Sequence, residues 1–405
     1  MNAYESTNHS YNSIRGNQRF INWNAQPSQF KSYPRFYTRI LLEKLPFLSK
    51  IAAINAKKQL SKDEFYYLRI NPSAGALYPN ELYVQARGID GLEDGIYHYD
   101  VKGSSLAFLA PVSAAYGLEA FLSDNSKVEG YLFFVSSAYF RSSWKYGNRA
   151  IRYCFLDAGH LLGCIEASAS LSDMAVKFVG DIDFDGANIF FGFENKESIV
   201  HAAIVGRRSE TKIQKPPFEL PFVLSYDYFE RNSFVEAFVS IGADGNLISK
   251  HYKQKEGLEN AILTRRSIRA FYGQNISKAE FDEISPCFYG EFVKAYFVVN
   301  RVEGVANGLY FGDKLLKDGD FSQKAGYLCL EQALGQDSAV TLFLLSNSND
   351  TKSALLEAGL IAHRIYVTSN IFGIGVSGIG AYYDDEVAEF VGDNSKVLYA
   401  VALGR

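Results

Sequence analysis

The sequence predicts an α+β fold made of two copies of one domain, and two observations carry this prediction. Short motifs recur in the same order about 200 residues further along the chain. Within each copy, alternating or compact apolar stretches typical of strands are combined with a long apolar stretch typical of a helix. A repeat of domain length indicates duplication and fusion and excludes a solenoid, whose repeats are far shorter.

Three pairs of motifs define the repeat. Residues 60–65 (LSKDEF) recur as 276–281 (ISKAEF), 156–159 (LDAG) as 356–359 (LEAG), and 200–207 (VHAAIVGR) as 398–405 (LYAVALGR). A chain of 405 residues has room for about two domains. We therefore predict an N-terminal extension over residues 1–36, a first domain over 37–211, a linker over 212–257 and a second domain over 258–405.

The same order of elements is expected in each copy. A helix-like opening is followed by an aromatic strand (81–86 and 292–299) and an apolar strand (131–136 and 340–345). A long apolar helix (154–171 and 354–370) and a closing strand that ends in Gly-Arg complete the copy. Helices that are apolar nearly all round are buried ones. We expect the two domains to pack through them as an intramolecular pseudo-dimer, because two related surfaces can bury one another.

Composition excludes several classes of protein. The net charge of −4 argues against a surface for nucleic acid. No stretch approaches the roughly 20 apolar residues of a membrane span, and the polar start carries no signal core. The four cysteines show no CxxC spacing, so we expect no metal site and no disulfide. Cys154 and Cys164 lie in an apolar helical run and are expected to be buried thiols of a cytoplasmic protein.

An arginine-rich motif opens the second copy. It contains Arg265, Arg266, Ser267 and Arg269, directly after an apolar helical turn. Guanidinium groups and a hydroxyl suit a phosphate dianion, whereas a solvated basic helix face is the alternative interpretation. The corresponding residues 40–47 (ILLEKLPF) of the first copy lack the cluster and contain a proline.

The first copy has instead a proline-bounded loop of small residues, 71–81 (NPSAGALYPNE). Such a loop lets main-chain amides and Ser73 approach a flat ring closely, although an ordinary surface loop has the same pattern. Its counterpart in the second copy, 285–291 (SPCFYGE), carries aromatic residues.

Two further motifs complete the candidate site. Residues 373–380 (GIGVSGIG) match GxGxxG but follow a helix, so they predict a ligand-binding turn and not a dinucleotide fold. Lys145 and Tyr146 lie in a Trp-Lys-Tyr-Gly loop before the apolar helix of the first copy and are candidate acid–base groups. His98 lies in a Tyr-His-Tyr strand, where a half-exposed packing role is expected.

At these residues the chain resembles the FMN-dependent nitroreductase superfamily, and within it the SagB/McbC-type (SagB/ThcOx) azoline dehydrogenases. The Arg-Arg-Ser-x-Arg motif resembles the superfamily's phosphate and ring motif. Residues 72–79 (PSAGALYP), 95–99 (GIYHY) and 144–147 (WKYG) resemble the SagB/McbC branch. The superfamily likeness spans residues 37–405, whereas the motifs of the branch are confined to the first copy.

The resemblance implies one FMN per chain, because each copy retains a different half of the site. The implied cofactor-binding residues are Arg265, Arg266, Ser267, Arg269, Gly378, Ile379 and Arg405 of the second copy with Pro72, Ser73, Ala74, Gly75 and Leu77 of the first. The implied catalytic pair is Lys145 and Tyr146. A mirror site is not expected to bind flavin, because it would combine residues 43–46 (EKLP) with the bulky 286–288 (PCF).

The implied function is a flavin-dependent dehydrogenase or oxidase that passes hydride from its substrate to flavin N5. The expected substrate is an azoline-containing peptide or a related small molecule, and neither nucleic acid nor a membrane is an expected partner. An NAD(P)H-dependent nitroreductase or flavin reductase is the first alternative, and a non-catalytic flavin-binding or scaffold protein is the second. The sequence leaves open the substrate, the electron acceptor, further oligomerisation and the role of residues 1–36, whose aromatic content suggests a strap.

Overall fold

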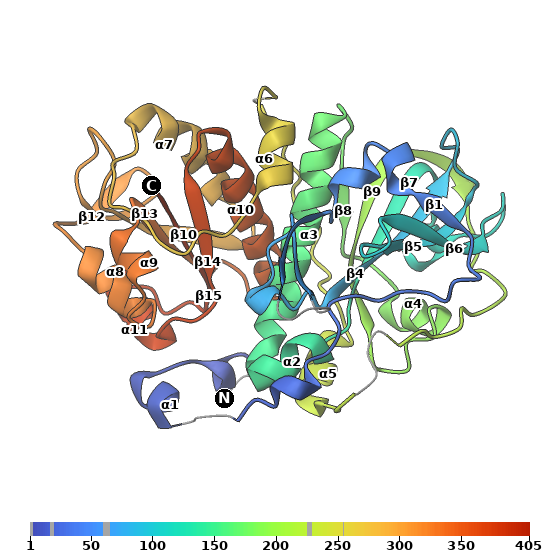
Figure 1. Cartoon of the computed structure of the whole chain (residues 1–405), viewed down its shortest axis with the longest axis horizontal. Helices are drawn as coiled ribbons and strands as arrows, with labels where there is room; N and C mark the ends of the chain where they lie inside the picture. Colours follow the sequence, from blue (N-terminus) through green and yellow to red (C-terminus); the bar gives the residue numbers. More distant parts are fainter. Residues whose placement is uncertain (1–2, 17–19, 60–64, 225–228, 254) are drawn as a thin grey trace. The chain divides into compact units, whose positions relative to one another are not determined.

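The computed structural model describes residues 3–16, 20–59, 65–224, 229–253 and 255–405 (Figure 1). The chain divides into two compact units. The first unit is Ile21–Lys253, and the second unit combines Met1–Phe20 with Gln254–Arg405. The N-terminal extension is therefore shared between the units, and most of the stretch 212–257 belongs to the first unit.

The first unit is built on a seven-stranded antiparallel sheet in the order β1-β6-β5-β4-β7-β9-β8. Its strands are β1 (Arg39–Leu41), β4 (Asn80–Arg87), β5 (Gly95–Asp100), β6 (Ser105–Pro111), β7 (Ser126–Ser137), β8 (Lys177–Val179) and β9 (Ser198–Lys212). A separate hairpin joins β2 (Ile54–Gln59) to β3 (Phe65–Arg69). The helices are α2 (Phe140–Tyr146), α3 (Ala150–Leu171), α4 (Phe184–Phe190) and α5 (Ser233–Val239).

The second unit is built on a six-stranded antiparallel sheet in the order β12-β11-β10-β13-β15-β14. Its strands are β10 (Val293–Val299), β11 (Gly308–Phe311), β12 (Lys314–Asp318), β13 (Val340–Ser346), β14 (Gly375–Ile379) and β15 (Val397–Gly404). Its helices are α1 (Tyr11–Gly16), α6 (Leu258–Thr264), α7 (Lys278–Ile284), α8 (Ser322–Leu328), α9 (Ala333–Asp337), α10 (Thr351–Ile371) and α11 (Asp384–Val391).

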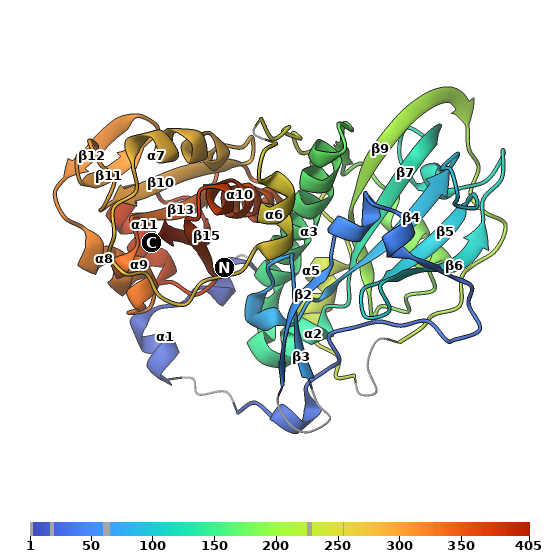
Figure 2. The same ribbon diagram turned by 45° about the horizontal axis from the view of Figure 1, so that its top comes forward.

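The two sheets share one strand order. The run β6-β5-β4-β7-β9-β8 of the first unit is matched by β12-β11-β10-β13-β15-β14 of the second. In each unit the long helix follows the central strand of this run and packs on the sheet, α3 on β7 and β9 and α10 on β14 and β15 (Figure 2). The predicted α+β class, the paired strands and the long apolar helices are therefore confirmed.

The helical opening expected in both copies is present only in the second, as α6. In the first unit the corresponding stretch begins as β1 and continues as a 3₁₀ turn over Leu42–Lys44. Pro46 explains the difference, because proline disfavours helical backbone at the residue before it and has no N–H to donate. Of the repeated motif 60–65, residues 60–64 lie outside the described chain, and Phe65 begins β3 whereas Phe281 lies in α7.

Both long helices are buried along almost their whole length, as their composition predicts. Cys154 and Cys164 on α3 are fully buried, and the cysteines of the described chain form no disulfide. Among the described residues, no helix is long and apolar enough to cross a membrane.

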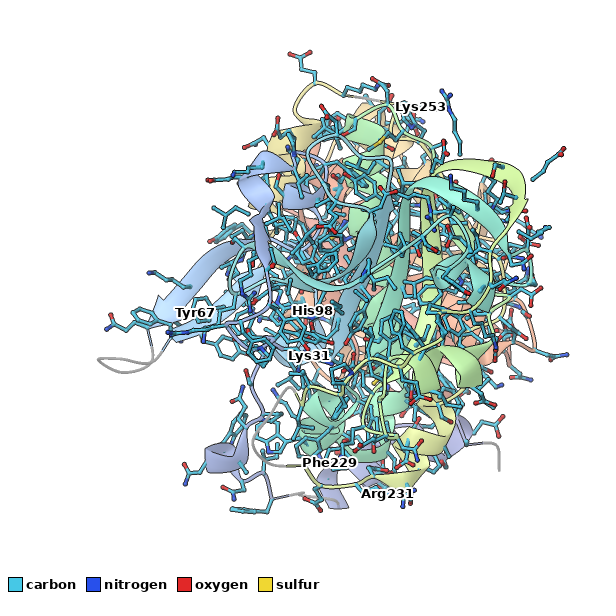
Figure 3. The ribbon with its side chains drawn as sticks, turned by 90° about the vertical axis from the view of Figure 1, so that its right-hand side faces the viewer. Lys31, Tyr67, His98, Phe229, Arg231 and Lys253 are labelled. Atoms are coloured by element: carbon cyan, nitrogen blue, oxygen red, sulfur yellow. The ribbon has the colours of Figure 1, made fainter. Side chains whose placement is uncertain are left out.

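The N-terminal extension packs firmly in each unit. In the second unit the Tyr4 hydroxyl donates to the carbonyl oxygen of Val397 (2.5 Å). In the first unit Lys31 is buried, and its Nζ donates to Tyr83 Oη (2.7 Å) and Glu197 Oε2 (2.8 Å). Figure 3 labels Lys31 beside His98 in the interior of this unit. The suggested strap is therefore a structural part of both units.

Candidate functional site

The proline-bounded loop of the first unit is held by a buried carboxylate on α3. Asp157 Oδ2 accepts a hydrogen bond from Ser73 Oγ (2.5 Å), and its Oδ1 accepts from the backbone N–H of Ala74 (3.2 Å). Ser73 Oγ in turn accepts from the backbone N–H of Tyr78 (2.8 Å). The residues of the predicted motif are thus tied to the helix that follows β7. Asp157 belongs to the repeated LDAG motif but was not among the predicted site residues.

Burial sets the protonation of this carboxylate. Burial raises the pKa of Asp157 to about 7, against the smaller lowering effect of its hydrogen bonds with Ser73 and Ala74. Near neutral pH the group is therefore poised between its protonated and ionised forms. A change of its charge acts directly on the loop that it holds.

The loop has a strained backbone at its tip. Gly75, Ala76 and Tyr78 all have positive φ values of 60°, 51° and 49°. Left-handed backbone is costly for residues other than glycine and persists only where the surroundings impose it. Here the Tyr66 hydroxyl donates to the carbonyl oxygen of Gly75 (2.5 Å), and Gln29 Nε2 donates to that of Ala76 (2.6 Å).

The predicted catalytic pair lies against the same loop. A Cβ atom added at Gly75 would be 2.5 Å from Tyr146 Oη and 3.0 Å from Lys145 Nζ. Gly75 itself is exposed. Two motifs separated by about 70 residues in the sequence therefore meet in the first unit. Glycine is favoured at this point by its φ value of 60°, and a larger residue would displace the ends of the Tyr146 and Lys145 side chains.

Aromatic side chains surround the lysine of this pair. Lys145 Nζ lies 5.5 Å from the ring centroid of Trp23 and 5.4 Å from that of Tyr146. Trp23 packs edge-on against Trp144 at 5.5 Å, and the Tyr146 ring is 4.5 Å from that of Tyr153. Rings at these distances favour a cation electrostatically and restrict its rotamers.

A buried ionic network positions α2, which carries the pair. Arg141 Nη1 lies 2.6 Å from Glu81 Oε1 and donates to the carbonyl oxygen of Tyr78 (2.7 Å). His98 Nε2 lies 2.9 Å from Glu81 Oε2. Burial alone would raise the pKa of Glu81, but Arg141, His98 and Arg69 together lower it to about 2. His98 is fully buried, so its expected half-exposed role is wrong.

The other predicted residues of the first unit have structural surroundings. Pro72 is buried between β3 and β4. Leu77 is 2% exposed and packs with Ala138, Phe140 and Trp144. The side chain of Leu77 therefore belongs to the core, and Leu77 contributes only its backbone to the surface of the loop.

In the second unit a tyrosine hydroxyl joins two of the predicted motifs. Tyr366 Oη, on α10, is 2.7 Å from Ser267 Oγ and accepts a hydrogen bond from the backbone N–H of Gly378 (2.7 Å). The buried Arg265 stacks over the Tyr366 ring at 5.1 Å, and its Nη1 is 3.5 Å from Ser267 Oγ. Sequence reasoning found Arg265, Ser267 and Gly378 but missed the residue that connects them.

Local geometry explains why these segments meet. Ser267 pairs with Val376 as an isolated parallel bridge, so the arginine motif lies along the edge strand β14. A Cβ atom at Gly378 would clash with the hydroxyl of Tyr399, so glycine is needed there for packing. His363 lies one turn before Tyr366 and is buried. Burial, together with the nearby charges of Arg265 and Arg364, lowers the pKa of His363 to about 3, so its imidazole is neutral.

The remaining predicted residues of this unit are more dispersed. Arg266 and Arg269 are exposed, whereas the side chain of Ile379 lies in the hydrophobic core. Arg405 pairs with Glu280, with Nη2 2.6 Å from Oε1, and also donates to the carbonyl oxygen of Phe372 (2.9 Å). This ion pair holds the pKa of Glu280 at about 2, so Arg405 is already neutralised in the structure.

The residues of both units fit the chemistry that FMN requires. In the second unit the Arg265 guanidinium and the Ser267 hydroxyl converge at Tyr366, and these are groups that suit a phosphate, whereas the Gly378 N–H is already engaged by the Tyr366 hydroxyl. In the first unit an exposed glycine lies beside an ammonium and a phenol, and this open backbone suits the approach of a flat ring. Arg405 departs from this pattern because Glu280 engages it.

The segments of the mirror motif lack these features. Residues 43–46 carry no arginine cluster, and Pro286 lies in a 3₁₀ turn, Ser285–Phe288. Phe288 is fully buried and packs against Phe281 and Phe297, with ring centroids 6.1 and 5.4 Å apart. Its side chain is therefore part of the core of the second unit.

Comparison with known proteins shows the fold of the chain. A crystal structure from Anabaena variabilis, of a protein provisionally named a nitroreductase, aligns with 100% of this chain and 98% of its own, with a TM-score of 0.79 and 23% sequence identity. The McbBCD microcin synthetase complex of Escherichia coli aligns with 44% of this chain and 71% of its own, with 16% identity and a TM-score of 0.33, too low to carry an argument. The fold is therefore that of the Anabaena protein, over both units.

Sequence comparison adds a local match. A protein of Methanocaldococcus jannaschii, also provisionally named a nitroreductase, is 28% identical over 111 residues. The match covers 27% of this chain and spans only 56% of the length of that relative. No family model matches the chain. The chain is thus similar in fold to the Anabaena protein over its whole length and similar in sequence to the Methanocaldococcus protein over this one stretch.

Proposed function

We propose that this chain is an FMN-dependent oxidoreductase of the nitroreductase superfamily that acts as a SagB-type dehydrogenase or oxidase with one FMN per chain. The observation that carries the proposal is the convergence of Gly75, Lys145 Nζ and Tyr146 Oη in the first unit. The ring-binding loop and the acid–base pair implied by the resemblance are distinct motifs in the sequence. Their meeting at one exposed glycine supports a common site.

The phosphate of FMN is assigned to the second unit. Arg265 and Ser267 would hold it, with the exposed Arg266 next to Arg265 in the chain, and Gly378 would keep its N–H on the Tyr366 hydroxyl that positions Ser267. The ring is assigned to the first unit, where residues 72–77 would contact it.

When bound, FMN supplies an acceptor at N5 for the two electrons of a substrate C–H bond. We assign the proton transfer to the chain: either Lys145 Nζ, as the neutral amine, or Tyr146 Oη, as the phenolate, would take a proton from the substrate, and that group must therefore lose its own proton first. Trp23 and Tyr146 keep the lysine in position, and Arg141 holds the helix that carries both groups. Oxygen or another external oxidant must then accept the electrons, and an azoline-containing peptide or related small molecule is the proposed substrate class.

Counting the flavin tests this proposal first. The purified chain is incubated with FMN and desalted, and the released flavin is measured by absorbance against protein. We expect one FMN per chain. Two flavins per chain would contradict the assignment of half-sites. No flavin would overturn the enzymatic proposal and favour a scaffold role.

A second candidate function is an NAD(P)H-dependent nitroreductase or flavin reductase. The Anabaena and Methanocaldococcus proteins are both provisionally named nitroreductases, and these names favour it. Mixing the flavin-loaded protein with NADH or NADPH under air-free conditions separates the two functions, since only the reductase bleaches its flavin rapidly. The matched variants Lys145→Met and Lys127→Met then show whether the lysine beside Gly75 is required.

A further inference from the structure

A cavity in the first unit lies near the acid–base pair of Lys145 and Tyr146 but is lined by other residues. It has a volume of about 450 Å³ and lies between the N-terminal segment 23–30 and strand β3. This volume is within the range of small-molecule sites, roughly 300–1,000 Å³. Its principal lining side chains are Trp23, Phe30, Phe65, Tyr66, Tyr67 and Lys102. Figure 3 labels Tyr67 on the projecting β2–β3 hairpin that forms one wall.

The cavity wall is ordered by hydrogen bonds that mimic a sheet. The side-chain amide of Gln29 is buried, accepts from the backbone N–H of Tyr67 (3.1 Å) and donates to its carbonyl oxygen (3.1 Å). Phe30 packs edge-on against Tyr67, with ring centroids 5.2 Å apart. The segment that closes the cavity is therefore fixed to β3 by these hydrogen bonds and by this ring contact.

The charge around these rings is positive. Lys102 Nζ lies 5.9 Å from the ring centroid of Phe30, and Lys57 Nζ lies 4.9 Å from that of Phe65. None of the described residues that line the cavity is acidic. Lys102 is exposed and makes no ion pair with any residue of the described chain. Aromatic walls beside an uncompensated cation favour a flat ligand that carries negative charge.

Two residues that line the cavity also contact the proposed catalytic site. Trp23 lines it and also lies 5.5 Å from Lys145 Nζ. Tyr66 lines it, and its hydroxyl donates to the carbonyl oxygen of Gly75 (2.5 Å). A group seated in the cavity is thus separated from the acid–base pair by the width of a single aromatic side chain.

We propose that this cavity binds the aromatic or heteroaromatic ring of a carboxylate-bearing substrate, with Lys102 pairing with the carboxylate. The ring lies among Trp23, Phe30 and Tyr67, and the reacting part of the molecule extends past Trp23 toward Lys145. The assignment of this ligand as the substrate rests on the proposed function, whereas its binding does not.

Isothermal titration calorimetry with naphthalene-2-carboxylate tests the proposal, and naphthalene-2-carboxamide serves as the neutral control ligand. We expect the carboxylate to bind about fivefold more tightly than the amide. Lys102→Ala should weaken the carboxylate about fivefold and abolish this preference. Lys127→Ala is the matched control, because Lys127 pairs with Glu129 on β7 outside the cavity, and it should change nothing.

A second variant probes the rings. Phe30→Leu should weaken both ligands to a similar extent while circular dichroism confirms the fold. Equal affinity for the two ligands, no binding at millimolar concentration, or an unchanged Lys102→Ala affinity would overturn the proposal. The titrations are run with and without FMN. Binding of the carboxylate to a chain that never retains flavin refutes only the enzymatic function, whereas a flavin-loaded chain that ignores the carboxylate refutes only this cavity.

Discussion

Asp157 and Glu357 occupy the same position in the repeated LDAG and LEAG motifs and perform the same task in the two units. Asp157 lies on α3 and holds the segment before β4, and Glu357 lies on α10 and holds the segment before β10. Asp157 accepts from Ser73 Oγ, and Glu357 accepts from the backbone N–H groups of Glu291 (3.0 Å) and Phe292 (2.7 Å). Burial raises the pKa of both carboxyl groups.

The two anchored segments, residues 71–81 and 285–291, expose different residues. In the first unit the carboxylate anchors a left-handed loop whose exposed Gly75 touches Lys145 and Tyr146. In the second unit the equivalent segment is a 3₁₀ turn that buries Phe288 in the core. Both units thus kept the strand order and the anchoring acid, while the residues that the anchor positions diverged. Fold alone therefore does not locate the chemistry in this chain.

The largest expected effect comes from the buried network of Arg141, Glu81 and His98, which lies next to the proline-bounded loop of the first unit. Arg141→Met removes the partner of a buried Glu81 and the donor to the Tyr78 carbonyl. Breaking a buried ion pair costs about 3–5 kcal/mol, and thermal and urea denaturation should show a loss of up to this size, since His98 and Arg69 still face the Glu81 carboxylate. The control Arg231→Met breaks an ion pair with Glu236 whose arginine is exposed, and it should change little. Equal losses would show that Arg141 has no special role.

The shared anchor should make stability depend on pH. The folded state raises the pKa of Asp157 from 3.8 to about 7, so it favours the protonated form. The stabilisation from this group is complete below about pH 4 and is lost as the pH rises through 7. Asp157→Asn does not titrate. The free energy of unfolding of the wild type, relative to this variant, should therefore fall between pH 4 and 7.5 by as much as about 4 kcal/mol.

Glu357→Gln is the matched variant of the second unit. The free energy of unfolding of the wild type, relative to Glu357→Gln, should also fall as the pH rises, because burial raises the pKa of Glu357 as well. If urea titrations show the same pH dependence for wild type and Asp157→Asn, the common role of the two acids is wrong.

A smaller effect is expected at the glycine that distinguishes the loops. Gly75→Ala introduces a Cβ 2.5 Å from Tyr146 Oη at a φ of 60°. Left-handed backbone alone costs an alanine about 1–2 kcal/mol, and displacement of Tyr146 and Lys145 adds to it. The control is Gly88→Ala, in the same unit, with a φ of 68° and open space around it. The two melting temperatures, with tryptophan fluorescence as a local probe, should separate the variants, and identical behaviour would sink the steric argument.

The smallest effect concerns the hydroxyl that joins the motifs of the second unit. Tyr366→Phe removes the hydrogen-bond partner of Ser267 and of the Gly378 N–H, at a cost of about 1 kcal/mol. FMN affinity, measured by fluorescence titration, should fall several-fold. Tyr310→Phe, whose hydroxyl contacts only the Ala306 carbonyl in the described chain, should leave FMN affinity unchanged. No difference between the two variants would remove Tyr366 from the proposed phosphate site.

Much of the candidate site could be predicted from short motifs, because these encode local chemistry. The arginine–serine cluster, the loop of small residues and the Lys-Tyr pair are all visible as residue types at fixed spacing. Asp157 was visible as part of a repeat, but nothing local indicated that it binds Ser73, 84 positions away. His98 was misjudged because alternation predicts one solvated face, whereas every residue of β4 and β5 is buried.

The sequence by itself determined the repeated motifs, the α+β class, the buried long helices and the candidate residues, since hydrophobic periodicity and side-chain chemistry are properties of short segments. Only the tertiary structure decided which of these residues meet. Gly75 touches Lys145 and Tyr146, Ser267 meets Gly378 at Tyr366, and Arg405 is engaged by Glu280. Such contacts depend on strand register and on the packing of distant segments, and these are set by the fold as a whole.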